Sequence, residues 1–251
     1  KAQKSSVIRE ILKVTANPQV ISFAGGLPAP ESFPVAQMKA AFDHVLKNDP
    51  QSALQYSTTD GYAPLREWVA NRMSTNGATI TPDQVIIVSG SQQALDLIAK
   101  VFIDPNDKVL VETPTYLGAL QAFSMFDPKY VSVDSDENGL IPEALTAEVA
   151  KDAKFLYALP NFQNPTGRMM SEERRQTLVE KAREHDLLVV EDDPYGALWY
   201  EAAPPASLLS RMPERVIHMG SFSKVLAPGL RLGYLIAPVE ITKKFEQAKQ
   251  A

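Results

Sequence analysis

From Val85 onward, short apolar runs rich in Val, Ile and Leu alternate with longer stretches of mixed polarity. The first run, Val85-Ile86-Ile87-Val88, contains no polar residue, which is typical of a strand that is covered on both faces. Such runs predict strands at 85–88, 109–111, 130–133, 155–158, 187–190, 216–219 and 234–236. The stretches between them predict helices at 92–102, 115–126, 142–150 and 171–185, and similar patterns precede them at 5–13, 35–46 and 64–73. Strands separated by helices indicate an α/β fold with a mostly parallel sheet and helices on both faces.

Composition excludes several classes of function. The chain of 251 residues has a net charge of −5 and a pI near 5.3, which argues against a nucleic-acid or membrane-surface partner. It has no cysteine, and His44, His185 and His218 lie far apart, so we expect no metal site. No apolar run approaches the roughly 20 residues of a spanning helix, and residues 1–10 do not resemble a signal peptide. We therefore expect a cytoplasmic protein.

The residues that follow several of the predicted strands carry many polar, charged and aromatic side chains that could bind a ligand. In a parallel sheet, ligands bind beyond the carboxyl ends of the strands, so these residues are expected to meet at one edge. The segments are Ser89-Gly90-Ser91-Gln92, residues 112–116, residues 161–167, Glu191-Asp192-Asp193-Pro194-Tyr195, and residues 221–231.

Each segment offers a different group. Gly90-Ser91 at a helix start could hold an anion, although it is also ordinary helix capping. One acid of the 191–193 run could pair with a cationic ring nitrogen, or the three acids could be solvated at the sheet edge. Asn164 and Tyr195 can hydrogen-bond a phenolate-type oxygen, and Tyr116 offers a flat face or plain core packing. Neither a G-x-G-x-x-G nor a G-x-S-x-G motif is present.

The loop at residues 221–231 adds a lysine, Lys224, between Ser221, Ser223 and Arg231. A lysine amine can form an imine with an aldehyde. An anion cradle, a flat aromatic ring, a carboxylate for a ring nitrogen and such an amine together describe a site for pyridoxal 5′-phosphate.

The motifs together carry a family resemblance that runs from about Ser5 to the end of the chain. They are Ile21-Ser22-Phe23-Ala24-Gly25-Gly26-Leu27-Pro28, Leu54-Gln55-Tyr56-Ser57, Gly90-Ser91-Gln92-Gln93-Ala94-Leu95-Asp96, Gln163-Asn164-Pro165-Thr166-Gly167, Glu191-Asp192-Asp193-Pro194-Tyr195, Gly220-Ser221-Phe222-Ser223-Lys224 and Pro228-Gly229-Leu230-Arg231. With them the chain resembles the pyridoxal phosphate-dependent class I aminotransferases of fold type I, and within these the 2-aminoadipate (LysN-type) and kynurenine aminotransferases.

The resemblance implies a domain plan. Residues 1–34 would form an N-terminal arm and substrate-site segment, and residues 35–251 the pyridoxal phosphate-binding large domain with its mostly parallel, mixed sheet. The family's small C-terminal domain would be absent from this chain. Because the sequence begins without Met and stops inside a predicted helix, we expect it to be a piece of something longer.

The resemblance also implies residue roles. Lys224, Asp192 and Tyr195 would be catalytic: Lys224 forms the imine and moves a proton, and Asp192 pairs with the ring nitrogen. Asp192 is preferred to Asp193 because the family places this acid three residues before the tyrosine. Tyr195 and Asn164 would hold the ring oxygen, and Tyr116 would stack on the ring. The phosphate would be bound by Ser91, Gln92, Ser221, Ser223 and Arg231.

Further implied roles concern the substrate and a second subunit. Gly26 and Asn164 would contact the substrate, and Arg9 would bind its distal carboxylate, although Arg9 could equally be a solvated helix residue. Tyr56 would reach the phosphate of the neighbouring subunit, which implies a homodimer.

The implied activity is transfer of an amino group between an amino acid of the 2-aminoadipate, aromatic or branched-chain type and 2-oxoglutarate. One alternative is the aminotransferase-like domain of a MocR-type transcription regulator, which carries an upstream winged helix-turn-helix; the segment before Ile21 is too short for one. Another is a fold-type I lyase or decarboxylase, which would use the same large domain.

Overall fold

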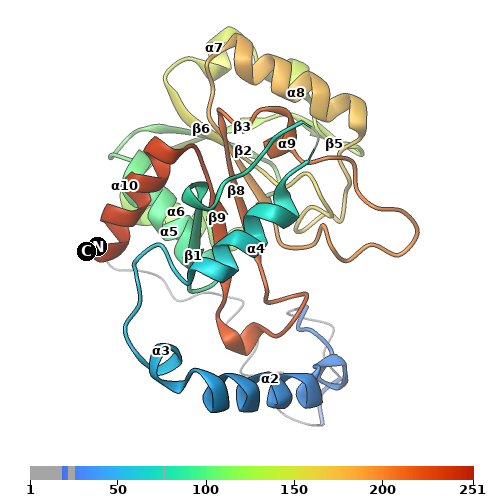
Figure 1. Ribbon diagram of the computed structural model, residues 1–251. Helices are drawn as coiled ribbons and strands as arrows, with labels where there is room; N and C mark the ends of the chain where they lie inside the picture. The colour runs from blue at the N-terminus through green and yellow to red at the C-terminus, as the bar shows by residue number, and fades with distance from the viewer. Residues whose placement is uncertain (1–18, 22–25, 76) are drawn as a thin grey trace.

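The computed structural model describes residues 19–21, 26–75 and 77–251, and a seven-stranded sheet forms its centre (Figure 1). The strands follow the order β1-β9-β8-β7-β6-β2-β3. Their bounds are β1 Val85–Val88, β2 Lys108–Glu112, β3 Lys129–Val133, β6 Ala153–Ala158, β7 Val189–Asp193, β8 Val216–Ser221 and β9 Gly233–Ile236. β9 is antiparallel to both neighbours, while the other neighbouring pairs are parallel, so the mostly parallel, mixed sheet is confirmed.

Helices cover both faces of the sheet, as the sequence predicts. One core cluster joins the sheet to α5 (Ser91–Phe102), α6 (Leu117–Phe123) and α10 (Val239–Gln250). The other joins it to α4 (Ala63–Met73), α8 (Glu172–Glu184) and α9 (Leu208–Arg211). The period of two along a strand sends neighbouring side chains to opposite clusters, as Val189 and Val190 of β7 illustrate.

The expected helix at 142–150 is wrong in detail. The structure has a 3₁₀ turn η4 (Pro142–Ala144) and a short α7 (Ala147–Ala150) instead. Thr146 separates the two because its hydroxyl accepts from the backbone N–H of Val149 and caps α7. A small hairpin of β4 (Ser135–Asp136) and β5 (Gly139–Leu140) was also not expected.

Other boundaries also differ from the predictions. The expected helix at 115–126 begins only at Leu117, and its last turn is the 3₁₀ segment η3 (Ser124–Phe126). The expected strand at 187–190 is shifted to Val189–Asp193, so the three acids at 191–193 lie within β7 rather than after it. The expected helix at 5–13 lies outside the described residues.

The connection from β8 to β9 contains no crossing helix. Residues 222–232 form a loop with one 3₁₀ turn, η5 (Pro228–Leu230), and the Phe222 backbone N–H donates to the Leu232 carbonyl at 3.0 Å. A connection that returns at the same edge makes β9 antiparallel to β8. It also holds the loop at the carboxyl end of β8.

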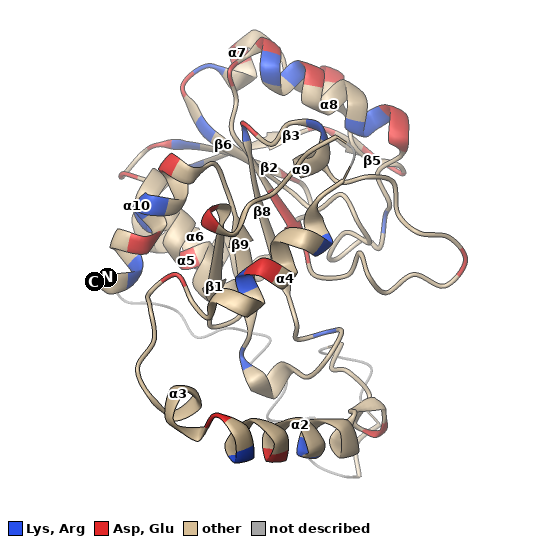
Figure 2. Cartoon of the chain, viewed as in Figure 1, with Lys and Arg blue, Asp and Glu red and all other residues tan. Residues whose placement is uncertain are grey.

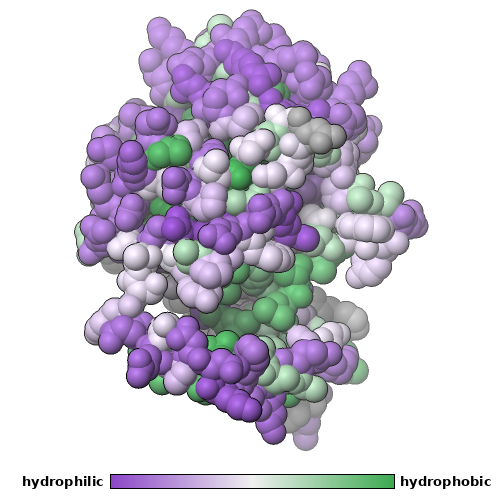
Figure 3. Space-filling view, in the orientation of Figure 1, coloured by the Kyte–Doolittle hydropathy of each residue, from purple (hydrophilic) through white to green (hydrophobic). Residues whose placement is uncertain are grey.

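An N-terminal segment stands apart from the sheet and its helices (Figure 1). It consists of η1 (Pro30–Ser32), α2 (Val35–Asn48) and α3 (Pro50–Leu54), and none of the residues in these three elements is buried. Figure 3 shows apolar residues gathered where this segment faces the rest of the molecule. By contrast, α8 carries charges of both signs on its surface (Figure 2). Among the helices of the described ranges, none is long and apolar enough to cross a membrane.

Candidate active site

Lys224 lies in the β8–β9 loop, beyond the carboxyl end of β8, and is half-buried. Its Nζ donates to the Gly26 carbonyl at 3.3 Å and lies 5.9 Å from the centre of the Tyr195 ring. No salt bridge to an acid is formed by this lysine within the described ranges. The amine is thus held near a strand-end tyrosine without a carboxylate to neutralise it.

Asp192 is the buried acid of the site. The alternation along β7 places it on the same face as Val190, and its side chain is only 3 % exposed. Its Oδ2 accepts a hydrogen bond of 2.6 Å from the hydroxyl of Tyr157, whereas its Oδ1 has no hydrogen-bond partner among the described residues. Burial raises the pKa of Asp192 to about 7, although the Tyr157 hydroxyl acts in the opposite direction.

Tyr195 and Tyr116 lie close enough to Asp192 for its charge to raise the pKa of each tyrosine, and Asn164 lies beside Tyr195. Burial raises the pKa of Tyr195, while the side chain of Asn164 acts in the opposite direction. Burial also raises the pKa of Tyr116, and the charge of Asp192 adds to the effect. A Cβ at Gly118 would lie 2.4 Å from the Tyr116 ring, so glycine there leaves room for the ring. The structure therefore brings these predicted residues together.

A corner suited to an anion forms where α5 begins. Gly90 is the N-cap with φ of 79°, and a Cβ on it would lie 2.5 Å from Nη2 of Arg231. The guanidinium therefore approaches the free N–H groups at the start of α5, beside Ser91. Arg231 itself has a left-handed φ of 50°, and its Nη1 donates to the Pro228 carbonyl at 3.3 Å.

Other predicted residues are placed as follows. Ser221 ends β8, and its hydroxyl accepts from the Ser223 backbone N–H at 3.1 Å, so the two serines lie at the junction between β8 and the loop that carries Lys224. Gln92 reaches from α5 to the Gly118 carbonyl at 3.4 Å. Tyr56 is 99 % exposed and lies outside this constellation. Arg9 lies outside the described residues.

Two polar side chains connect the loops that carry Tyr116 and Asn164. Glu112, at the end of β2, accepts from the Leu159 backbone N–H at 3.1 Å, and burial raises its pKa to about 7. Gln163 donates to the Pro114 carbonyl at 2.7 Å and so bridges the two loops directly. This links the positions of Tyr116 and Asn164.

Glu191 points to the opposite face of β7 from Asp192. It is the register partner of His218 on β8, and His218 Nδ1 lies 2.9 Å from Oε2 of Glu191. Burial alone would raise the pKa of Glu191, but His218 and the backbone N–H groups of Leu208 and Leu209 hold it below its ordinary value. The carboxylate therefore serves as a buried anchor for α9 and lies on the face opposite Asp192.

Three features of the described residues suit the binding of pyridoxal phosphate, and none of them depends on a sequence motif. A buried carboxylate oxygen, Oδ1 of Asp192, lacks the donor that a protonated ring nitrogen would supply. The glycine at position 90 lets an arginine reach a helix N-terminus, which suits a phosphate dianion. The Lys224 amine lies 5.9 Å from the ring centre of Tyr195, which follows Asp192 by three residues at the end of β7.

Sequence reasoning missed Tyr157, the Glu191–His218 pair and the buried Arg175. Tyr157 sits in an apolar run and gave no polar signal. His218 was considered only as a metal ligand. Arg175, fully buried, donates to the Met170 and Pro160 carbonyls, and nothing in its helical pattern distinguishes it from its partly exposed neighbour Arg174.

Comparisons of the sequence and of the structure with known proteins point to the same family. The model of the aminotransferase class I and II family matches residues 19–251. The chain is 44% identical to aromatic-amino-acid aminotransferase 1 of Thermococcus litoralis and to 2-aminoadipate transaminase of Thermus thermophilus, covering 99% and 98% of this chain and 61% and 62% of those proteins.

Among solved structures, LysN, the α-aminoadipate aminotransferase of Thermus thermophilus in complex with N-(5′-phosphopyridoxyl)-L-leucine, superposes with a TM-score of 0.90 at 43% identity, covering 99% of this chain and 62% of that one. The chain thus spans about three-fifths of the length of these relatives. The architecture is that of fold type I, and the family and this ligand complex support pyridoxal phosphate as the cofactor. The chain belongs to the aminotransferase class I and II family.

Proposed function

We propose that the protein containing this chain is a pyridoxal phosphate-dependent aminotransferase that transfers an amino group between an amino acid and 2-oxoglutarate. The observation that carries the proposal is a lysine amine in the same strand-end region as a buried carboxylate with one oxygen atom free of partners. The printed names of the two curated relatives support this activity. No observation favours a regulator, a lyase or a decarboxylase over it.

In this proposal four residues would act at the cofactor and the reacting atoms. Lys224 would hold the cofactor and move the proton at the substrate Cα. Asp192 would keep the ring nitrogen protonated, and Tyr195 with Asn164 would hold the ring oxygen. When bound, the cofactor supplies an electron sink for the bonds at that carbon.

The remaining site residues bind and orient. Tyr116 would stack on the ring, and the N-terminus of α5 with Arg231 would receive the phosphate, because a planar bidentate donor suits a dianion. The other phosphate ligands are Ser91, Gln92, Ser221 and Ser223.

Substrate choice is the least constrained part of the proposal. Gly26 and Asn164 would line the substrate site, and Arg9 would bind a distal carboxylate. We propose 2-aminoadipate, aromatic or branched-chain donors, in keeping with the names of the relatives. We also propose that the chain divides into an arm (1–34) and a large domain (35–251). The same proposal includes a small domain elsewhere in the protein and a cytoplasmic location.

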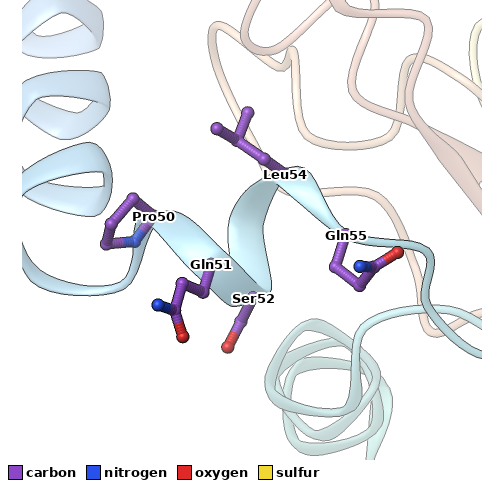
Figure 4. A pocket seen from close by; sticks show the side chains of 5 residues that line it. All are labelled: Pro50, Gln51, Ser52, Leu54 and Gln55. Atoms are coloured by element: carbon purple, nitrogen blue, oxygen red, sulfur yellow. The ribbon is translucent and has the colours of Figure 1, made fainter.

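We further propose that the active unit is a homodimer in which Tyr56 serves the neighbouring site. Tyr56 and Leu54 are 99 % and 79 % exposed, which is unusual for large apolar side chains at the end of a helix. Leu54 lines a pocket together with Pro50, Gln51, Ser52 and Gln55, and Figure 4 shows that it points away from Gln51 and Ser52. A second copy would cover this surface. Tyr56→Phe in the whole protein should then weaken binding of the cofactor without changing the dimer mass measured by light scattering.

The activity is tested by visible absorption of the purified whole protein with bound cofactor. Addition of 2-aminoadipate, glutamate or leucine should convert the band of the lysine-bound cofactor to that of its amine form, and a keto acid should appear in step with glutamate when 2-oxoglutarate is present. Release of ammonia or carbon dioxide in place of glutamate would refute transamination.

A further inference from the structure

Tyr157 makes a contact that the proposed function does not yet use. It lies on β6, is fully buried, and donates through its hydroxyl to Oδ2 of Asp192 at 2.6 Å. Its ring packs edge-on against Phe123, with ring centroids 5.6 Å apart. The packing of the ring and the short hydrogen bond of its hydroxyl together fix the orientation of Tyr157. The same hydrogen bond fixes the orientation of the Asp192 carboxylate.

The contact divides the two oxygens of Asp192 between two tasks. Oδ2 is occupied by Tyr157, and Oδ1 is left without a partner among the described side chains and backbone groups. A carboxylate at the end of a buried strand could otherwise rotate about its Cβ–Cγ bond. The hydroxyl of Tyr157 therefore determines which oxygen is available to a ligand.

The same contact changes the basicity of the carboxylate. Burial raises the pKa of Asp192 by disfavouring its ionised form, and the neighbouring charge of Asp193 adds to that effect, whereas Tyr157 and His218 favour ionisation. Donation from a neutral phenol stabilises the carboxylate without adding a formal charge to the site. Burial and the Asp192 charge raise the pKa of Tyr157 well above its ordinary value, so this residue remains a donor over the working pH range.

We propose that Tyr157 is a positioning residue that turns Oδ1 of Asp192 toward the ring nitrogen of the cofactor and keeps the proton shared by these two atoms on the nitrogen. The proposal rests on the proposed function, because it needs pyridoxal phosphate in this site. The shared proton can reside on the nitrogen, leaving a carboxylate, or on Oδ1, leaving a neutral acid and a neutral ring. A donor at Oδ2 favours the first arrangement, and its removal moves the proton toward oxygen.

The test is Tyr157→Phe in the whole protein, which removes one oxygen and keeps the ring. The main measurement is the ¹⁵N resonance of the ring nitrogen with isotope-labelled cofactor. In the wild type we expect the position of a protonated ring, and in Tyr157→Phe a movement toward the position of a neutral ring. Tyr130→Phe is the matched control, because Tyr130 donates to the Leu120 carbonyl, outside the site, and its loss should leave the resonance unchanged.

A second measurement uses affinity. Tyr157→Phe should weaken binding of pyridoxal phosphate by about tenfold, since a hydrogen bond to a charged group contributes at least that factor. The 1-deaza analogue, which has a C–H group in place of the ring nitrogen, should lose less than about twofold, because it has no ring-nitrogen proton to share with Asp192. If both ligands weaken equally, Tyr157 supports only the shape of the site and the inference is wrong.

Failure of this inference is distinguishable from failure of the proposed function. A ¹⁵N resonance that moves in Asp192→Asn but not in Tyr157→Phe would overturn the role of Tyr157 and leave the cofactor site intact. A wild-type protein that binds no cofactor would overturn the proposed function itself. If Tyr157→Phe does not fold, 4-aminophenylalanine placed at position 157 keeps the ring and a donor group but donates more weakly, and should move the resonance toward the position of a neutral ring; no movement would refute the role.

Discussion

Replacing Glu191 by glutamine tests the buried pair on the face of β7 opposite the site. Glu191 is completely buried and accepts three hydrogen bonds, from the Leu208 N–H at 2.8 Å, the Leu209 N–H at 3.0 Å and His218 Nδ1 at 2.9 Å. Each of these donors faces a carboxylate oxygen. Glutamine keeps the shape but replaces one oxygen by an NH₂ group that is itself a donor.

The expected cost follows from these contacts. Removing one partner of a buried ion pair costs about 3–5 kcal/mol, because the remaining charge is left uncompensated. Since His218 can become neutral in the variant, we expect a loss of stability at the lower end of this range. About 1–3 kcal/mol of that loss arises because a backbone N–H then faces the NH₂ group of the glutamine, which is also a donor. A loss of about 3 kcal/mol corresponds to a fall in Tm of roughly 6–12 °C at about 2–4 °C per kcal/mol.

The pH dependence of this loss is also defined. The folded-state pKa of Glu191 lies below its ordinary value of 4.5, so its contribution is present above pH 4.5 and is lost as the pH falls through the lowered pKa. Glu191 raises the pKa of His218 above its ordinary value of 6.5, despite burial, so the histidine's contribution is present below pH 6.5 and is lost as the pH rises through the raised pKa. The difference between wild type and variant should be largest between pH 4.5 and 6.5.

The assay is thermal unfolding of the whole protein, followed by far-ultraviolet circular dichroism at several pH values. Glu184→Gln is the matched control, because the same substitution there affects only an exposed pair with Lys181. A fall in Tm of less than about 2 °C for Glu191→Gln, or a fall that stays constant from about pH 5 to about pH 9, would refute the reasoning.

Three further outcomes are expected. Arg175→Met should cost about 3 kcal/mol or more in urea unfolding, because it leaves several buried acceptors unpaired, whereas Arg174→Met should cost far less; equal losses would contradict this. Glu112 has a folded pKa of about 7, so its contribution to stability falls as the pH rises from 4.5 to 7, and Glu112→Gln should make that slope shallower; an unchanged slope would contradict the assignment. Gly90→Ala should weaken cofactor binding at least about tenfold, measured by fluorescence titration, because its Cβ would meet Arg231 at a strained φ; wild-type affinity would contradict the anion corner.

The sequence was sufficient for the strands of the main sheet and for the edge at which the site lies. Unbroken apolar runs such as 85–88 predict buried strands, and parallel strands bring their carboxyl ends together, so Asp192, Tyr195 and Lys224 could be grouped without coordinates. The family resemblance supplied their proposed roles.

The partners of these residues could not be predicted, because they depend on strand order and register. Tyr157 meets Asp192 only because β6 lies beside β7, and Glu191 meets His218 only because β7 and β8 pair in one register. A residue's period along a strand gives its face but not its neighbour. At Thr146 the sequence is compatible both with a continuous helix and with the capped start of a new one. The helical pattern does not distinguish between these two structures.

The central claim is that the amine of Lys224 carries the cofactor. It is tested most directly by reducing the cofactor-loaded whole protein with borohydride, digesting it, and locating the phosphopyridoxyl group by mass spectrometry. The account predicts that the group lies on the peptide containing Lys224 and that Lys224→Ala abolishes the labelling. Labelling of a different lysine, such as Lys249, or normal transamination by Lys224→Ala would contradict it.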